Sequence, residues 1–266
     1  MSEEPTNPNR IIAIPQNIRV VPPTPLHEML ASGRREYTKF QNDQGDEFIE
    51  MQSNKFASDQ MLVTSLLASR PGQKPIVPCS AIIAHKTKEG SWRYFSHRTP
   101  VDYMPEMAKA EALACELFLN YVFMDPEHNV EYRQNLQIKP ISDELVRISF
   151  FDFHHAAYFW AKCDYYPMHT GALDVLVSLE MRKTTLQVSR DEIRKALILK
   201  LQAFSDLLQG EQGLAFMTEI VGYIPETPRL IRGAASPTDS EEEHIKAFRD
   251  DLLRRTHSTL ALFQNK

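Results

Sequence analysis

The chain has 266 residues, of which 42% are hydrophobic and 24% are charged, enough apolar mass for an ordinary globular core. The formal net charge of −5 gives no basic field of the kind that marks nucleic-acid-binding proteins, so we expect no nucleic-acid partner. No apolar run approaches the length of a membrane-spanning helix, and the N-terminal region lacks the basic and apolar segments of a signal peptide.

Cysteine usage indicates the compartment. Cys79, Cys115 and Cys163 lie far apart, and two of them lie within apolar runs. This pattern favours reduced, buried thiols over a disulfide framework. We therefore expect a cytoplasmic protein without a membrane partner.

The N-terminal part of the chain is predicted to lead into a single domain. Residues 1–9 are polar, which predicts a flexible N-terminus, and the domain is expected over residues 10–232. Its first predicted elements are an edge strand over Arg10–Val21 that contains Pro15, a short helix over Leu26–Ser32, a strand over Phe48–Met51 and a helix over Asp59–Ala68.

A hairpin and a helix form the predicted centre. The first strand, Ile76–His85, is apolar and β-branched, and an aromatic-rich strand follows over Trp92–Arg98. The spacing then changes to intervals of three and four residues, which predicts an amphipathic helix over Met104–Phe123, packed on a flat surface.

The second half of the domain is predicted to hold two more strands and two helices. The strands are expected over Asn135–Pro140 and Leu145–Cys163. One helix is expected to start at Ser189 and to end at Leu208, because glycines follow at positions 210 and 213. The other is expected over Leu214–Tyr223.

The C-terminal end changes in composition. Residues 233–243 are small, polar and acidic, which predicts a linker. An apolar stripe over residues 244–266 predicts an amphipathic helix that docks on its own domain, on a second copy in a homodimer, or on another protein.

The order of these elements resembles the Nudix hydrolase superfamily, especially Nudix-like proteins with an N-terminal extension. Three short sequence segments carry the resemblance: KPIVPCSAIIAH from Lys74, the pair Arg98-Thr99 at the end of the hairpin, and Cys115–Asn120 at the position of the Nudix helix. The resemblance covers residues 10–223. It implies an α+β fold, a mixed β-sheet with helices on both faces in an α/β/α sandwich.

The Nudix motif itself is degenerate. The loop between Thr99 and Met104 has no glycine, and Cys115 stands where the family has arginine. Of the three glutamates in the second half of the motif, only Glu116 remains, beside Leu119 and Asn120. A single carboxylate cannot assemble the cluster that holds divalent metal against a pyrophosphate. We expect no cofactor, the alternative being Mg²⁺ or Mn²⁺.

Two sets of candidate site residues follow. His97, Arg98, Glu116 and Asn120 are candidates for binding a nucleotide-like ligand, since arginine binds phosphate through two parallel hydrogen bonds. Catalytic candidates are Glu116, Asp152 and His154. Asp152 and His154 share one face of a strand and could form a metal or acid–base site, but hydrogen-bonded residues at strand ends explain the same pattern.

The leading functional hypothesis is a Nudix-like protein that binds a ligand or a partner without hydrolysis, as a sensor, regulator or assembly subunit. A metal-dependent hydrolase of nucleoside diphosphate derivatives with a non-standard site is the alternative. A purely structural or interaction protein, held in a homodimer by the C-terminal helix, is the third.

Overall fold

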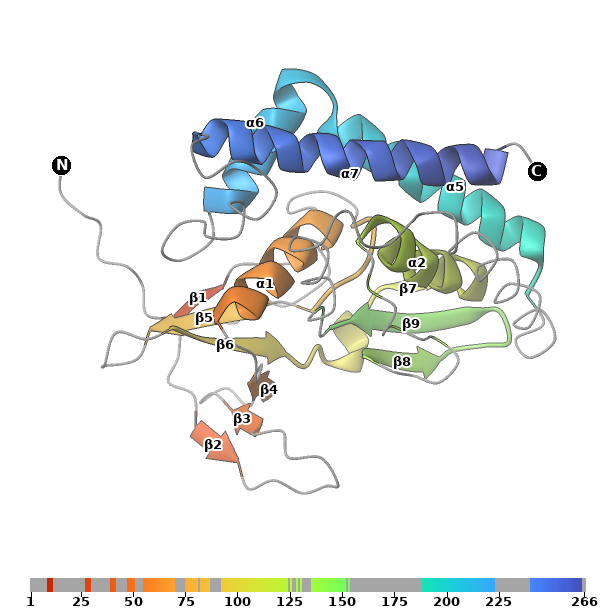
Figure 1. Cartoon of the computed structure of the whole chain (residues 1–266). Helices are drawn as coiled ribbons and strands as arrows, with labels where there is room; N and C mark the ends of the chain where they lie inside the picture. The colour runs from red at the N-terminus through yellow and green to blue at the C-terminus, as the bar shows by residue number, and fades with distance from the viewer. Residues whose placement is uncertain are drawn as a thin grey trace.

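A computed structural model gives the fold of the chain (Figure 1). Its described helices lie together on one side of its described strands (Figure 1). The predicted α+β class is confirmed, whereas helices on both faces stay a prediction. The structure describes residues 9–11, 27–29, 39–41, 47–50, 55–69, 75–80, 82–86, 92–123, 125, 128, 130, 135–151, 153, 188–222 and 240–264.

The described strands form two antiparallel sheets rather than the single mixed sheet that we expected. The larger sheet has the order β1 (Asn9–Ile11), β5 (Ile82–Lys86), β6 (Trp92–His97), β4 (Glu47–Glu50), β3 (Lys39–Gln41) and β2 (His27–Met29). The smaller sheet has the order β7 (Glu106–Ala108), β9 (Leu145–Phe150) and β8 (Leu136–Pro140). An isolated parallel bridge between Cys79 and Phe150 connects the chain before β5 to the end of β9.

The central hairpin is present, but its first strand starts later than predicted. Pro78 has no N–H to give to a ladder, and the N–H groups of Ile76 and Val77 both donate to Ala68 O at the end of α1 (Lys55–Ser69). These bonds accompany a bend at residues 76–77, after which Cys79 bridges to Phe150, and the described strand β5 begins at Ile82.

Several other predicted boundaries are wrong for local reasons. Met104 is extended because Pro105 follows it, so β7 precedes the helix α2 (Lys109–Val122). Within the predicted helix at Leu26–Ser32, the described residues form the strand β2, which pairs with β3. Of the predicted edge strand, residues 10 and 11 belong to β1, and residues 12–21 lie outside the described residues. The elements α1, β4 and β8 lie where we expected them, and β9 starts where predicted, although residues 154–163 of that predicted strand lie outside the described residues.

The helices α5 (Arg190–Leu208) and α6 (Gly210–Gly222) are separated by a single residue. Gly210 has a φ of 63°, which glycine adopts without strain, so the break at this position is confirmed. Gly213 does not break the chain, because it lies within α6. A Cβ atom there would meet Leu208 O at 2.0 Å, so the close approach of the two helices requires glycine.

The C-terminal helix α7 (Glu241–Gln264) docks on its own domain, across α5, α6 and α2 (Figure 1). The predicted stripe, including Ile245, Phe248 and Leu252, is buried. At the far end of the helix, Arg194 Nε donates to Phe263 O at 2.6 Å. None of the described helices has the length and apolar character needed to span a bilayer.

The three glutamates at the end of the predicted linker form the first turn of α7, and residues 233–239 of that linker lie outside the described residues. Ser240 Oγ and Ser240 N both donate to Glu243 Oε2, at 2.8 and 2.7 Å, and Glu243 N donates to Ser240 Oγ at 3.3 Å. This reciprocal arrangement is a capping box, which satisfies two N–H groups that a helix start leaves free.

We expect Ser240→Ala to lower the free energy of unfolding by about 1 kcal/mol, because the cap of α7 is lost. Ser258→Ala, in the middle of the same helix, should be neutral or slightly stabilising because alanine has the higher helix propensity. Chemical denaturation at neutral pH measures both. Equal destabilisation by the two variants would contradict the capping role.

The same cap depends on pH. The hydrogen bonds from Ser240 hold the pKa of Glu243 below its usual value. A lowered pKa means that the stabilisation is present above the ordinary glutamate pKa, and is lost as pH falls through the lower, folded value. The difference in stability between the wild type and Glu243→Gln should therefore disappear on acidification.

Candidate functional site

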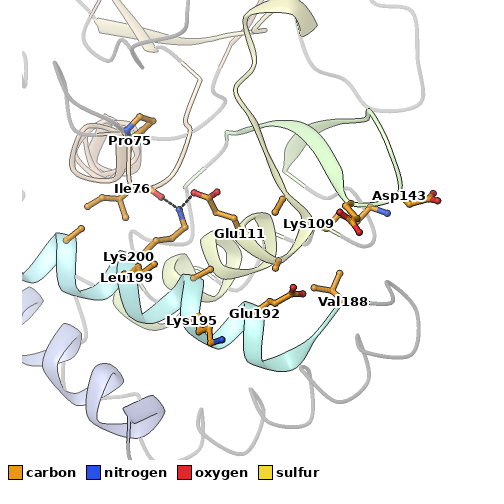
Figure 2. Close-up of a pocket in the computed structure, with 15 residues that line it drawn as sticks. Pro75, Ile76, Lys109, Glu111, Asp143, Val188, Glu192, Lys195, Leu199 and Lys200 are labelled. Atoms are coloured by element: carbon orange, nitrogen blue, oxygen red, sulfur yellow. Dashed lines mark hydrogen bonds and ion pairs between the residues drawn. The ribbon is translucent and has the colours of Figure 1, made fainter.

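A groove of about 750 Å³ opens between the first turn of α2 and the first half of α5. Figure 2 shows its lining residues, which come from these two helices, from Pro75 and Ile76 and from the turn between β8 and β9. The volume lies within the range of pockets for small ligands. It is the candidate functional site of the part of the chain that the structure describes.

The groove exists because small side chains face each other across it. Ala110 of α2 and both Ala196 and Ala203 of α5 line it, so the two helices leave space where larger side chains would meet. Lys109 N, at the start of α2, donates to Glu144 O at 2.9 Å, which holds the turn between β8 and β9 at the same end.

Lys200 is buried in the wall of the groove, with 8% of its surface exposed. Its Nζ donates to Ile76 O at 2.7 Å and to Glu111 Oε1 at 3.3 Å (Figure 2). Burial alone would lower the pKa of Lys200, but interactions with Cys115 and Glu111 outweigh it and raise this pKa above its usual value. The ammonium therefore stays charged and joins three segments that are distant in sequence.

The rim of the groove carries charges of both signs. Asp143, Glu144 and Glu192 contribute carboxylates, and Lys109 and Lys195 contribute ammonium groups. Asp143, Glu144, Glu192 and Lys195 are exposed, and within the described residues none of the five side chains takes part in an ion pair. These groups are available to a ligand.

Glu116 points away from the groove into the core. It is 1% exposed, and its Oε2 accepts a hydrogen bond from Val130 N at 2.9 Å. A carboxylate that holds a backbone N–H in the core has a structural role. The glutamate that we expected at a Nudix-like site therefore does not line the groove.

His97 and Arg98 belong to the larger sheet and do not line the groove either. His97 is 1% exposed and packs on Phe48, with 5.2 Å between the ring centroids. Arg98 is exposed, and its NH1 pairs with Glu47 Oε2 at 3.3 Å. None of His97, Arg98 and Glu116 lines the groove, so their grouping in one ligand site stays a prediction.

Of the three remaining candidate site residues, the structure describes only Asn120. Asn120 is half-buried on α2, outside the groove, and its Oδ1 has no hydrogen-bond partner within the described part of the chain. Asp152 and His154 lie outside the described residues. Among the residues described, no three His, Cys, Asp or Glu side chains are grouped so that they could hold a metal ion.

The predicted reduced thiols are observed for two of the three cysteines. Cys79 and Cys115 are fully buried thiols that are not joined in a disulfide, and Cys163 lies outside the described residues. Burial raises the pKa of the Cys79 thiol, the nearby Cys115 raises it further, and a hydrogen bond with Ser65 opposes both. Cys79 therefore remains a neutral thiol that packs in the core.

A second buried pair holds the chain after α2. His128 Nδ1 lies 3.4 Å from Asp125 Oδ1, and His128 Nε2 lies 2.8 Å from Phe151 O. The imidazole also stacks on Phe153, with 4.8 Å between the ring centroids. The pair therefore connects the end of α2 to the end of β9.

The sequence analysis missed Lys200 and Glu111, although one signal was present. Lys200 lies in the buried stripe of α5, three residues after Leu197 and four before Phe204. A lysine among apolar residues at this spacing indicates a buried charge that needs a partner. Comparison with protein-family models, with curated proteins and with solved structures found no match.

Lys200→Met should lower the free energy of unfolding by about 2 kcal/mol, because Ile76 O and Glu111 lose their buried partner. Lys195→Met, exposed on the same helix, should change it by only about 0.5 kcal/mol. Urea denaturation of both variants tests the difference. Similar losses in the two would contradict the role given to Lys200.

The stabilisation by Lys200 should also depend on pH. Because its folded pKa is raised, this stabilisation is fully present below the ordinary lysine pKa of about 10.4 and is lost as pH rises through the folded value. The stability difference between wild type and Lys200→Met should shrink only in that alkaline range.

Glu116→Ala should destabilise the chain by about 1–3 kcal/mol, because Val130 N is left without its buried acceptor. Glu116→Gln should cost much less, since the amide oxygen can still accept this hydrogen bond. Thermal unfolding compares the two variants, and an equal loss in both would contradict the structural role.

Proposed function

We propose that the chain is a Nudix-like, non-hydrolytic binding protein, a sensor, regulator or assembly subunit whose ligand or partner occupies the groove between α2 and α5. The observation that carries this proposal is that the two glutamates of α2, Glu111 and Glu116, have different surroundings. Glu116 is buried against Val130 N, whereas Glu111, one and a half turns earlier, lies in the wall of an open groove. The binding surface and the remaining Nudix glutamate are therefore separate.

The order of elements supports the Nudix-like part of the proposal. A hairpin (β5 and β6), a helix (α2), a strand pair (β8 and β9) and a closing helix (α5) follow one another along the chain. The parallel bridge from Cys79 to Phe150 is the kind of contact that a mixed sheet needs. On the same basis we propose the full α/β/α sandwich. We also propose a cytoplasmic location, because the Cys79 and Cys115 thiols are reduced.

The lining of the groove supports binding rather than hydrolysis of a pyrophosphate. Its carboxylates are interspersed with lysines, and Glu111 is already paired with Lys200 at 3.3 Å. Metal clusters that act on pyrophosphates need carboxylates free of such competition. Mixed charges on an otherwise aliphatic surface are instead typical of specific binding sites.

Ligand binding can be tested with a thermal-shift panel of nucleoside diphosphate derivatives and other small metabolites, followed by Ala196→Trp. The indole would fill the groove, so a stabilising ligand should lose its effect on this variant. Ala215→Trp, which places the same side chain at an exposed position of α6, should respond as the wild type does. An equal shift in all three proteins would contradict binding in the groove.

The absence of hydrolysis needs a separate test. The purified chain should not turn over nucleoside diphosphate derivatives in Mg²⁺ or Mn²⁺, as followed by phosphate release. Turnover that disappears in Glu116→Gln would overturn the proposal, because this substitution should leave the fold intact.

A further inference from the structure

Three exposed apolar side chains, Leu199, Ile141 and Leu145, lie in the groove or beside the turn that forms part of its rim. Among the described residues, the large hydrophobic side chains that are exposed are Leu199 (66%), Ile141 (45%), Tyr103 (42%) and Leu145 (39%). Leu199 lines the groove itself. Ile141 and Leu145 bracket the turn that contributes Asp143 and Glu144 to the rim, and Ile141 N donates to Leu145 O at 3.0 Å.

The position of Leu145 connects this apolar rim to the wall. Leu145 lies opposite Ala108 in the pairing of β9 with β7, and Ala108 lines the groove. An apolar surface therefore extends from Leu199 on α5, across the alanines of the groove, toward the turn between β8 and β9. A ligand confined to the groove would leave the part of this surface beside that turn uncovered.

The charges of the rim disfavour a ligand whose charged groups are all positive or all negative. Lys109 and Glu144 lie at the α2 end, and Glu192 and Lys195 are three residues apart on α5. A purely anionic ligand would meet the carboxylates, and a purely cationic one would meet the lysines. A ligand that carries both signs can pair with each set.

The described wall contains aliphatic side chains and alanines but no aromatic ring. Nucleotide bases are commonly held by stacking on aromatic side chains, which this surface does not supply. Ile76, Val188 and Leu199 instead offer contacts suited to leucine-like side chains.

We propose that the groove receives a short segment of a partner protein, with aliphatic side chains flanked by residues of opposite charge. This inference rests on the proposed function and names the class of its partner. A peptide segment is favoured because it can lie in the groove and also extend over Ile141 and Leu145. Its charged ends would pair with the carboxylates and the lysines of the rim.

The test uses three fluorescently labelled peptides with acetylated and amidated ends, titrated against the full chain by fluorescence anisotropy. Their sequences are ELALK, which carries both signs, and the single-sign controls KLALK and ELALE. We expect the mixed peptide to bind about tenfold more tightly than either control, with an affinity that falls as salt is raised. Equal affinities, or no binding by any of the three, would overturn the inference.

Two matched variants locate the binding surface. Leu199→Ser should weaken the mixed peptide about fivefold, since an exposed hydrophobic contact is lost without disturbing the core. Tyr103→Ser removes a comparably exposed side chain that does not line the groove, and should leave the affinity unchanged. Equal weakening by both substitutions would overturn the assignment of the surface.

The two proposals can fail separately. A small molecule that stabilises the wild type but not Ala196→Trp, with no peptide binding, would support binding in the groove and overturn the peptide inference. Peptide binding that persists in Ala196→Trp would overturn both, because the occupied surface would then lie elsewhere.

Discussion

Helix α2 is buried along most of its length, and the positions of the other elements follow from this constraint. Every residue from Ala112 to Leu119 is buried. A helix that is apolar all round needs neighbours on every side, and α2 has α5 and α7 on one side and β7 and β9 on another (Figure 1). Its first turn is partly exposed, and the groove opens at that turn.

Lys200 connects the interior of this arrangement to the groove. Its ammonium donates to a carbonyl of the segment after α1 and to Glu111 at the start of α2, while its stem belongs to α5. A charge in an apolar wall is tolerated only when such partners are close and well placed. The same contacts that satisfy the charge therefore also link α5 to α2 and to the segment after α1 in the wall of the groove.

The functional reading depends on which faces of α2 are accessible. Residues Cys115–Asn120 carry the predicted resemblance to the Nudix motif, and of these Glu116 faces the core and holds the chain near Val130. Residues 108–111 face a surface with paired charges, alanines and exposed aliphatic groups. The predicted motif and the candidate binding surface thus belong to one helix but to different ends of it, and the proposal of binding without hydrolysis rests on this separation.

The sequence by itself determined the α+β class, the helices α1, α5 and most of α7, and the hairpin of β5 and β6, because these depend on local periodicity and on glycine and proline positions. It located neither the two separate sheets nor the groove, and it did not indicate that His97 and Glu116 are buried. Only the tertiary structure decided these points. Strand partners, the direction in which Glu116 points and the meeting of Lys200 with Glu111 all depend on contacts between residues distant in the chain, which no local pattern encodes.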